Sequence, residues 1–124
     1  MNVKSPLVSI VDDDESVRES LPDLLKEFGY RVDVFSSAES FLDAGSQTIS
    51  DCLILDVAMP GMTGPELQRE LIRRNELIPI IFITAHRDET VRRRLIQDGA
   101  VDCLYKPFSD AALQDALGIA LKSA

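Results

Sequence analysis

The sequence has no tryptophan, one histidine and two cysteines, which leaves few residues for the common metal and redox motifs. Cys52 and Cys103 each lie inside an apolar run and lack the close cysteine or histidine spacing of a zinc or thiol redox motif. We therefore expect both thiols to be buried in strands. No apolar run approaches the roughly 20 residues that cross a bilayer, and no secretory signal opens the chain, so a soluble cytoplasmic protein with no membrane partner is expected.

Basic residues are also scarce, with 13 Lys and Arg against 21 Asp and Glu and a net charge of −8. Such a chain is repelled by a phosphate backbone, so we expect no direct nucleic-acid binding by this segment. The one dense basic stretch runs from Arg92 to Arg94 and is flanked by acids, which is typical of a solvated helix face.

The 124 residues, of which 45% are hydrophobic, suit a single domain spanning residues 1–124. Short apolar runs alternate with amphipathic segments along the whole chain, without a repeat or a linker. The runs at 7–11, 30–35, 52–55, 78–83 and 101–105 predict strands, and each is followed by a predicted helix. Five such units in order predict an α/β fold with a doubly wound parallel sheet and helices on both faces.

Several local features of the helices are predicted as well. Pro22 falls inside the first helix and should cause a kink or a local break there. Ser36 and Glu39 have capping-box spacing at the start of the second. Ile72 in the third and Val91 in the fourth are expected on buried faces.

Residues whose side chains can bind a metal or take part in a reaction lie at the ends of four predicted strands. Asp12 and Asp13 follow the first, Asp56 ends the third, Thr84 ends the fourth and Lys106 follows the fifth. The carboxyl ends of parallel strands share one edge of a sheet, so these side chains should meet there. Each of these residues alone has a purely structural interpretation. A lone Asp at a strand end is more often a helix cap or turn residue, and a lone Lys-Pro is usually part of a loop.

Three close carboxylates repel one another and therefore require a cation. Oxygen ligands in small number together with water favour Mg²⁺ over Ca²⁺. Such a site also suits phosphoryl transfer, with a carboxylate as nucleophile, Lys106 pairing with one phosphoryl oxygen and Thr84 donating a hydrogen bond to another.

The motifs Val11-Asp12-Asp13, Leu55-Asp56 with Met59-Pro60-Gly61 and Gly64, Ile83-Thr84-Ala85 and Lys106-Pro107-Phe108 resemble the response-regulator receiver signature. Gly99-Ala100-Val101-Asp102 before the lysine is most similar to the FixJ-type subfamily. The resemblance covers nearly the whole chain. It implies a flavodoxin-like (CheY-like) fold with strand order 2-1-3-4-5, an order already described for CheY.

The resemblance also implies roles for individual residues. Asp56 would be the phospho-acceptor, Asp13 a direct metal ligand, Asp12 a ligand through water and the carbonyl of Ala58 a third protein ligand. The bond between Lys106 and Pro107 would be cis. A sensor histidine kinase would supply the phosphoryl group, and a helix-turn-helix DNA-binding output domain, absent from these residues, usually follows such receivers. The chain would be a signalling receiver that catalyses only its own phosphorylation and dephosphorylation.

The chain departs from the family pattern at Cys103, where an aromatic switch residue is common three positions before the lysine. Tyr105 is expected to point to the opposite face of the strand and not to replace it. His86 could tune hydrolysis of the acyl phosphate or bind an anion, although an exposed loop histidine is the simpler interpretation.

Signalling is expected on the surface of the fourth helix, fifth strand and last helix, since Thr84 and Lys106 directly precede those elements. Arg92, Arg93 and Arg94 could face the acids Asp102, Asp110 and Asp115 of a second copy in a phosphorylation-dependent two-fold dimer. Exposed charge pairs are individually weak, so ordinary solvated charge is the alternative.

Three other functions are alternatives to this interpretation. A flavodoxin-like cofactor enzyme would need a glycine-rich loop where Asp12 and Asp13 stand. An aspartyl phosphatase would normally carry a second acid two residues after its nucleophile, where this chain has Ala58. An interaction module without phosphorylation would not need the complete acid set, and a metal titration would distinguish it.

Overall fold

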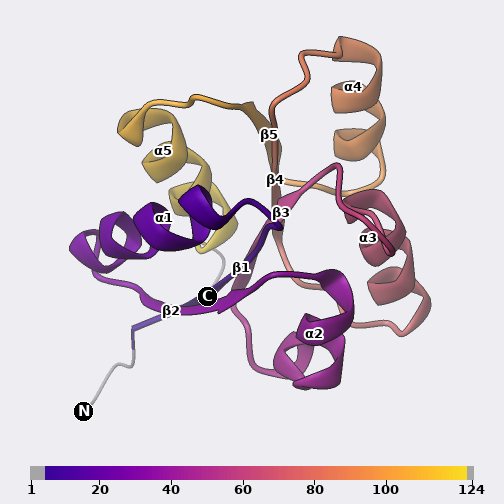
Figure 1. Cartoon of the computed structure of the whole chain (residues 1–124), viewed down its shortest axis with the longest axis horizontal. Helices are drawn as coiled ribbons and strands as arrows, with labels where there is room; N and C mark the ends of the chain where they lie inside the picture. Colours follow the sequence, from indigo (N-terminus) through magenta and orange to yellow (C-terminus); the bar gives the residue numbers. More distant parts are fainter. Residues whose placement is uncertain (1–4, 123–124) are drawn as a thin grey trace.

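The computed structural model describes residues 5–122, and its centre is a parallel sheet of five strands in the order β2-β1-β3-β4-β5 (Figure 1). The strands are β1 (Leu7–Val11), β2 (Arg31–Phe35), β3 (Cys52–Asp56), β4 (Ile80–Thr84) and β5 (Asp102–Tyr105). The helices are α1 (Glu15–Glu27), α2 (Ala38–Asp43), the short 3₁₀ helix η1 (Ser46–Thr48), α3 (Gly64–Arg73), α4 (Glu89–Gln97) and α5 (Asp110–Ala120). The doubly wound fold and the strand order 2-1-3-4-5 are confirmed.

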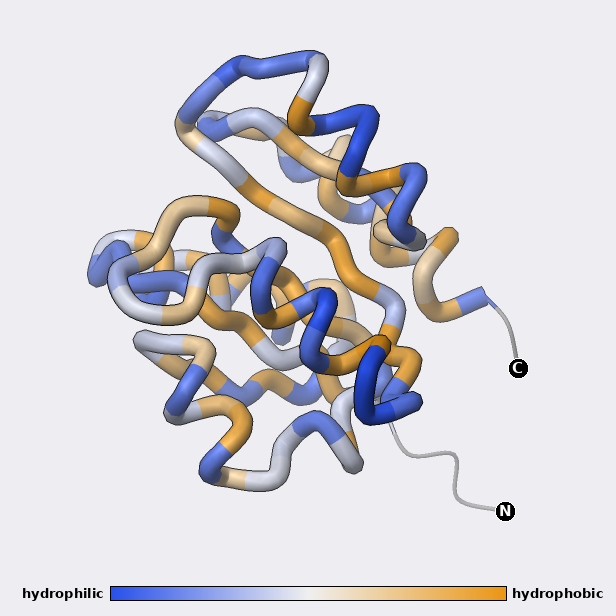
Figure 2. The backbone as a smooth tube through the Cα atoms, turned by 90° about the vertical axis from the view of Figure 1, so that its right-hand side faces the viewer, coloured by the Kyte–Doolittle hydropathy of each residue, from blue (hydrophilic) through white to orange (hydrophobic). Residues whose placement is uncertain are grey.

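Helices cover both faces of the sheet, with α1 and α5 on one side and α2, α3 and α4 on the other (Figure 1). Every residue of β1, β3 and β4 is buried, which explains why these strands are largely apolar, and orange segments run through the inside of the molecule in Figure 2. The edge strand β2 is the least buried, with only Val32 and Phe35 half-buried and its other three residues exposed. Cys52 and Cys103 are buried, as predicted. Between residues 5 and 122, none of the helices combines the length and the apolar character that a bilayer crossing needs.

The helix α1 continues through Pro22, so the predicted local break is wrong. A proline in a helix interior costs about 3 kcal/mol relative to alanine. Leu21 and Leu25 lie on either side of it and are buried against the sheet. Their burial holds the helix together where its sequence alone favours an interruption.

The start of α2 is also different from the prediction. Its N-cap is Ser37, whose hydroxyl accepts a hydrogen bond from the backbone N–H of Ser40 at 3.0 Å. The Glu39 carboxylate instead accepts from the backbone N–H of Met62 at 2.9 Å and so ties α2 to the loop after β3. The capping box of Ser36 and Glu39 is therefore wrong, because Glu39 has a tertiary partner.

Two apolar residues expected inside are exposed. Ile72 of α3 is 48% exposed and Val91 of α4 is 38% exposed, whereas Leu71 and Leu95 beside them are buried. The apolar stripe of each helix is thus narrower than its sequence pattern suggests. The buried residues of α3 are Gly64, Leu67, Gln68 and Leu71, and that of α4 is Leu95, so Ile72 and Val91 fall outside the buried faces.

Candidate functional site

The predicted site residues lie at one edge of the sheet, where β1, β3, β4 and β5 end. Asp12 follows β1, Asp56 ends β3, Thr84 ends β4 and Lys106 follows β5. The chain passes from β1 to β2 on one side of it, whereas β3, β4 and β5 lie on the other side, so the strand order reverses at β1. Crevices at such a reversal of strand order are the usual ligand sites of open α/β sheets.

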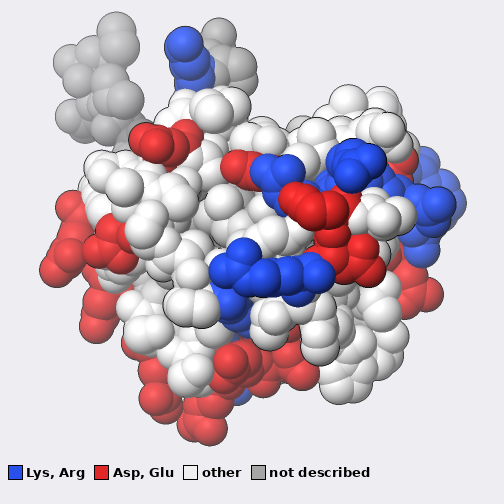
Figure 3. All heavy atoms as spheres, turned by 90° about the horizontal axis from the view of Figure 1, so that it is seen from above, with Lys and Arg blue, Asp and Glu red and all other residues white. Residues whose placement is uncertain are grey.

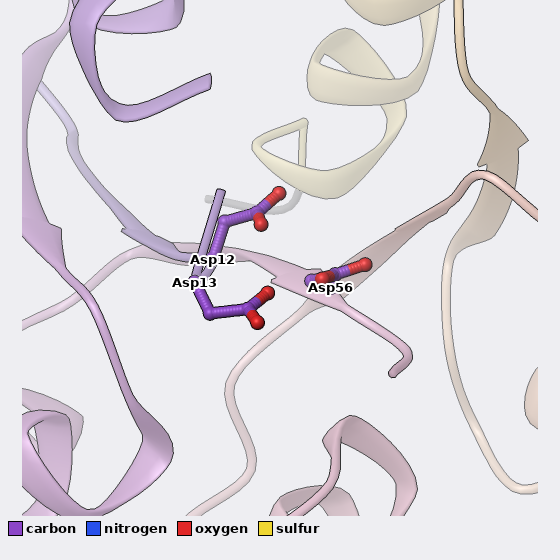
Figure 4. A group of neighbouring side chains, drawn as sticks. All are labelled: Asp12, Asp13 and Asp56. Atoms are coloured by element: carbon purple, nitrogen blue, oxygen red, sulfur yellow. The ribbon is translucent and has the colours of Figure 1, made fainter. Parts of the chain in front are cut away.

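Three carboxyl groups from this edge lie together. Asp12, Asp13 and Asp56 each offer an oxygen atom, and these atoms lie within 4.8 Å of one another (Figure 4). Asp12 and Asp56 are buried, whereas Asp13 is exposed. Oxygen donors in this number are positioned to bind a hard metal ion, with the exposed side left open to water or substrate.

The ammonium group of Lys106 lies among the same acids. Its Nζ is 2.9 Å from Oδ2 of Asp12 and 3.7 Å from Oδ1 of Asp56. Burial opposes the charge of this lysine, but the hydrogen bond to Asp12 and the attraction of Asp56 together raise its pKa above the usual value. Lys106 therefore stays charged and offsets part of the repulsion between the acids. The peptide bond from Lys106 to Pro107 is cis, in the isomer that the resemblance implies.

The surroundings of Asp56 disfavour its charged form. Burial and the neighbouring charge of Asp12 raise its pKa from 3.8 to about 7, although Lys106 acts in the opposite direction. A bound cation would reverse this shift, since it would favour the charged carboxylate. The site thus holds a carboxylate whose charge is costly until a cation is present.

Gly64 allows the loop after β3 to fold back against the site. Its N–H donates to the carbonyl of Val57 at 3.0 Å, and a Cβ at this position would overlap the carbonyl oxygen of Asp56. The glycine of the Met59-Pro60-Gly61 to Gly64 motif is thus needed for close approach of two backbones. Ala58 lies in this loop, and its role as a carbonyl ligand stays a prediction.

Two backbone contacts support the site. The hydroxyl oxygen of Thr84 accepts a hydrogen bond from the backbone N–H of His86 at 3.1 Å, which ties the loop after β4 to the threonine. Arg18 of α1 donates to the carbonyl of Asp12 at 3.0 Å. Arg18 was missed from the sequence, and its position one turn into a helix after the acidic loop was the available signal. His86 is exposed, as its simpler interpretation required.

Tyr105 and Cys103 point to the same face of β5, so the expectation that they face apart is wrong. Cys103 packs in the apolar cluster that contains Leu95 of α4. The hydroxyl of Tyr105 donates to the carboxylate of Glu89, the first residue of α4, at 3.1 Å. Residues two apart in a strand share a face, whereas only immediate neighbours alternate.

The arginines of α4 are not equivalent. Arg92 pairs with Asp102 of the same chain at 2.9 Å and donates to the carbonyl of Cys103 at 3.1 Å, so these two charges already have partners within the chain. Arg93 and Arg94 are exposed. Figure 3 views the molecule from the side of α4, β5 and α5, where basic side chains lie toward the centre and right, with acidic ones among them as well as along the left and lower margins.

Comparison with known sequences decides the family. The sequence model of the response regulator receiver domain matches residues 8–118. The chain belongs to this family. The site described above therefore belongs to a receiver domain of a two-component signalling protein, and the metabolic-enzyme alternatives are set aside.

Individual relatives place this receiver domain among response regulators of the FixJ type. It is 45% identical to the response regulator protein TmoT of Ectopseudomonas mendocina over 124 residues, all of this chain and 56% of TmoT. It is 42% identical to the transcriptional regulatory protein FixJ of Azorhizobium caulinodans over 114 residues, 92% of this chain and 54% of that protein. The chain thus spans about half the length of the curated relatives it matches.

A solved structure supports the same placement. The crystal structure of FixJ-N superposes with a TM-score of 0.87 at 37% identity, covering 98% of both chains. The resemblance to FixJ-type receivers, drawn from the motifs, is confirmed by sequence and by fold.

Proposed function

We propose that this receiver domain accepts a phosphoryl group on Asp56 from a sensor histidine kinase in a Mg²⁺-dependent reaction. The observation that supports the proposal most is the surroundings of Asp56. Its carboxyl group ends the buried strand β3, has two further acids within 4.8 Å, and lies 3.7 Å from the ammonium of Lys106. A cytoplasmic location and a single domain over residues 1–124 belong to the same proposal.

The donor set fits Mg²⁺, because carboxylate oxygens of Asp12, Asp13 and Asp56 converge and their mutual repulsion calls for a cation. Asp13 and Asp56 would bind the ion directly, Asp12 through water, and the carbonyl of Ala58 would complete the protein ligands. When bound, Mg²⁺ neutralises the growing charge on the phosphoryl oxygens.

The chain's own residues carry the transfer. A carboxylate oxygen of Asp56 attacks the phosphorus, an O–P bond forms, and the N–P bond to the histidine of the kinase breaks with the electron pair leaving on nitrogen. Lys106 leaves its contact with Asp12 to pair with a phosphoryl oxygen, and the Thr84 hydroxyl donates to another. Attack of water on the phosphorus later breaks the bond from Asp56 oxygen to phosphorus, releases inorganic phosphate and restores the carboxylate, so the domain catalyses only its own phosphorylation and dephosphorylation.

The test uses acetyl phosphate as the donor and intact-mass measurement as the readout. We expect the wild type to gain one phosphoryl group when Mg²⁺ is present and none when the metal is chelated. Asp56→Asn should gain none, and Asp13→Ala should be labelled poorly at any Mg²⁺ concentration that saturates the wild type. Labelling of Asp56→Asn to the wild-type extent would overturn the assignment.

The response to phosphorylation should emerge at α4, β5 and α5. Thr84 and Lys106 directly precede parts of this surface, so movement of either side chain toward the phosphoryl group changes it. Through this surface the domain would control a transcription-regulating output domain or its own dimerisation, as the name of the related transcriptional regulatory protein FixJ suggests. The segment itself would not bind DNA, because its net charge is −8.

A further inference from the structure

Tyr105 connects β5 to the segment between β4 and α4. Its hydroxyl donates to the carboxylate of Glu89 at 3.1 Å, and the guanidinium carbon of Arg87 lies over its ring at 5.0 Å from the centroid. The two partners lie on either side of Asp88, the N-cap of α4. A single side chain of β5 therefore holds both the end of the β4–α4 loop and the first residue of the helix.

The same loop is tied to the site at its other end. Thr84 accepts the N–H of His86 at 3.1 Å, and His86 directly precedes Arg87. Thr84 and Tyr105 are also register partners on the adjacent strands β4 and β5. Any displacement of the Thr84 side chain therefore pulls on a short loop whose far end is held by Tyr105.

One turn further along α4 the attachment to β5 is of a different kind. Arg92 contacts the backbone carbonyl of Cys103 as well as the Asp102 carboxylate. Along the chain, Arg92 lies farther from the β4–α4 loop than Glu89, the partner of Tyr105, does. It fixes the middle of the helix and leaves the first turn, held through an exposed hydrogen bond, as the part that can detach.

We propose that Tyr105 is a positioning residue for the phosphorylation site, which holds the β4–α4 loop and Thr84 in the resting arrangement and releases Glu89 when Asp56 is phosphorylated. This inference rests on the proposed function. The ring keeps Arg87 in place and the hydroxyl keeps Glu89 in place, so the two contacts can be removed separately.

The first test reads Tyr105 directly. The sequence has two tyrosines and no tryptophan, so Tyr30→Phe leaves Tyr105 as the sole tyrosine fluorophore. Hydrogen bonding of a phenol to a carboxylate quenches its emission. We expect the emission of Tyr30→Phe to rise on treatment with acetyl phosphate and Mg²⁺, in proportion to the phosphoryl content measured by mass. The double variant with Asp56→Asn should show no change.

The second test measures the rate of labelling by acetyl phosphate. Tyr105→Phe keeps the ring and loses the bond to Glu89, so the resting arrangement weakens and the initial rate should rise about threefold, the value of one modest hydrogen bond. Glu89→Ala should act alike, and Glu89→Gln, which retains an acceptor, should stay near the wild type. Tyr30→Phe and Arg93→Ala are the matched controls and should not alter the rate.

The outcomes separate the two proposals. Absence of a phosphoryl adduct on the wild type would overturn the proposed function and this inference with it. An adduct on Asp56 with unchanged Tyr105 emission, or equal labelling rates for the wild type, Tyr105→Phe and Glu89→Ala, would overturn the inference alone.

Discussion

Asp56 is placed where its charge is poorly supported in the absence of a cation. Burial removes water from the carboxylate and Asp12 repels it, while Lys106 is shared between the two acids at 2.9 and 3.7 Å. One ammonium cannot fully compensate two buried carboxylates and an exposed third. The charged carboxylate of Asp56 is therefore stabilised strongly when a divalent ion binds. The burial and repulsion that make its charge unfavourable also make its charge state sensitive to the metal.

The unfavourable charge of Asp56 in the folded chain predicts how folding stability depends on pH. The pKa of Asp56 is raised from 3.8 to about 7 in the folded chain, so the folded state binds the proton more tightly than the unfolded state. The contribution of this proton to folding stability is fully present below the pKa of Asp56 in the unfolded chain. It is lost as the pH rises through the pKa of Asp56 in the folded chain. Without divalent cations, Asp56→Asn should therefore be more stable than the wild type at pH 7.5, by on the order of 2 kcal/mol.

Urea unfolding with a chelator present measures this difference. The advantage of Asp56→Asn should shrink as the pH is lowered toward 4.5, because the wild type then carries the proton. Adding Mg²⁺ at pH 7.5 should raise the stability of the wild type more than that of Asp56→Asn. An advantage that is equal at both pH values would show that it does not come from the charge of Asp56.

At the scale of the elements, the position of α3 requires a glycine as the first residue of the helix. Gly64 lies against the backbone of β3, and a methyl group there would also contact the ring of Phe82 at 3.0 Å. By contrast, Gly118 lies in α5 with nothing within 4 Å of its potential Cβ. The same substitution should therefore have opposite effects in the two helices.

Gly64→Ala should destabilise the fold by about 1–3 kcal/mol, because the loop must move away from Asp56. Gly118→Ala should stabilise it by up to about 1 kcal/mol, since alanine favours an exposed helix position. Both values follow from urea unfolding at one pH. The labelling rate should fall in Gly64→Ala and stay unchanged in Gly118→Ala, and equal stability of the two variants would contradict the close approach at Gly64.

At the scale of the whole molecule, the chain is acidic, yet three consecutive arginines lie in α4. Because Arg92 and Asp102 neutralise each other within the chain, a dimer through this surface would depend on Arg93 and Arg94 facing Asp110 and Asp115 of a second copy. All four of these side chains are exposed. A two-fold arrangement could pair each set with the other.

Sedimentation of the unphosphorylated and phosphorylated forms tests this dimer. Phosphorylation should strengthen self-association, and Arg93→Glu should weaken it about fivefold or more at low salt, since each subunit contributes the charge once. Arg73→Glu is the control, because Arg73 is an exposed arginine of α3 that pairs with Glu70. Equal association of both forms, or equal effects of the two variants, would argue against an interface at α4, β5 and α5.

The sequence alone determined the main features of the fold and the location of the site. The apolar runs at 52–55 and 78–83 predict central strands of a parallel sheet, and the polar residues that follow parallel strands share one edge of it. The strand order and the individual roles needed the resemblance to receiver domains as well, because periodicity does not say which strands are neighbours. The sequence thus predicts the acid cluster of Asp12, Asp13 and Asp56.

Tertiary structure decided the partners of individual side chains. Glu39 pairs with the loop after β3 instead of its own helix, Arg92 finds Asp102 within the chain, and Tyr105 reaches Glu89. The raised pKa of Asp56 likewise depends on how deeply it is buried and how close Asp12 lies. Local pattern predicts elements because burial repeats with helix and strand periods, but a polar side chain chooses among partners distant in sequence, and only the packed chain brings them within reach.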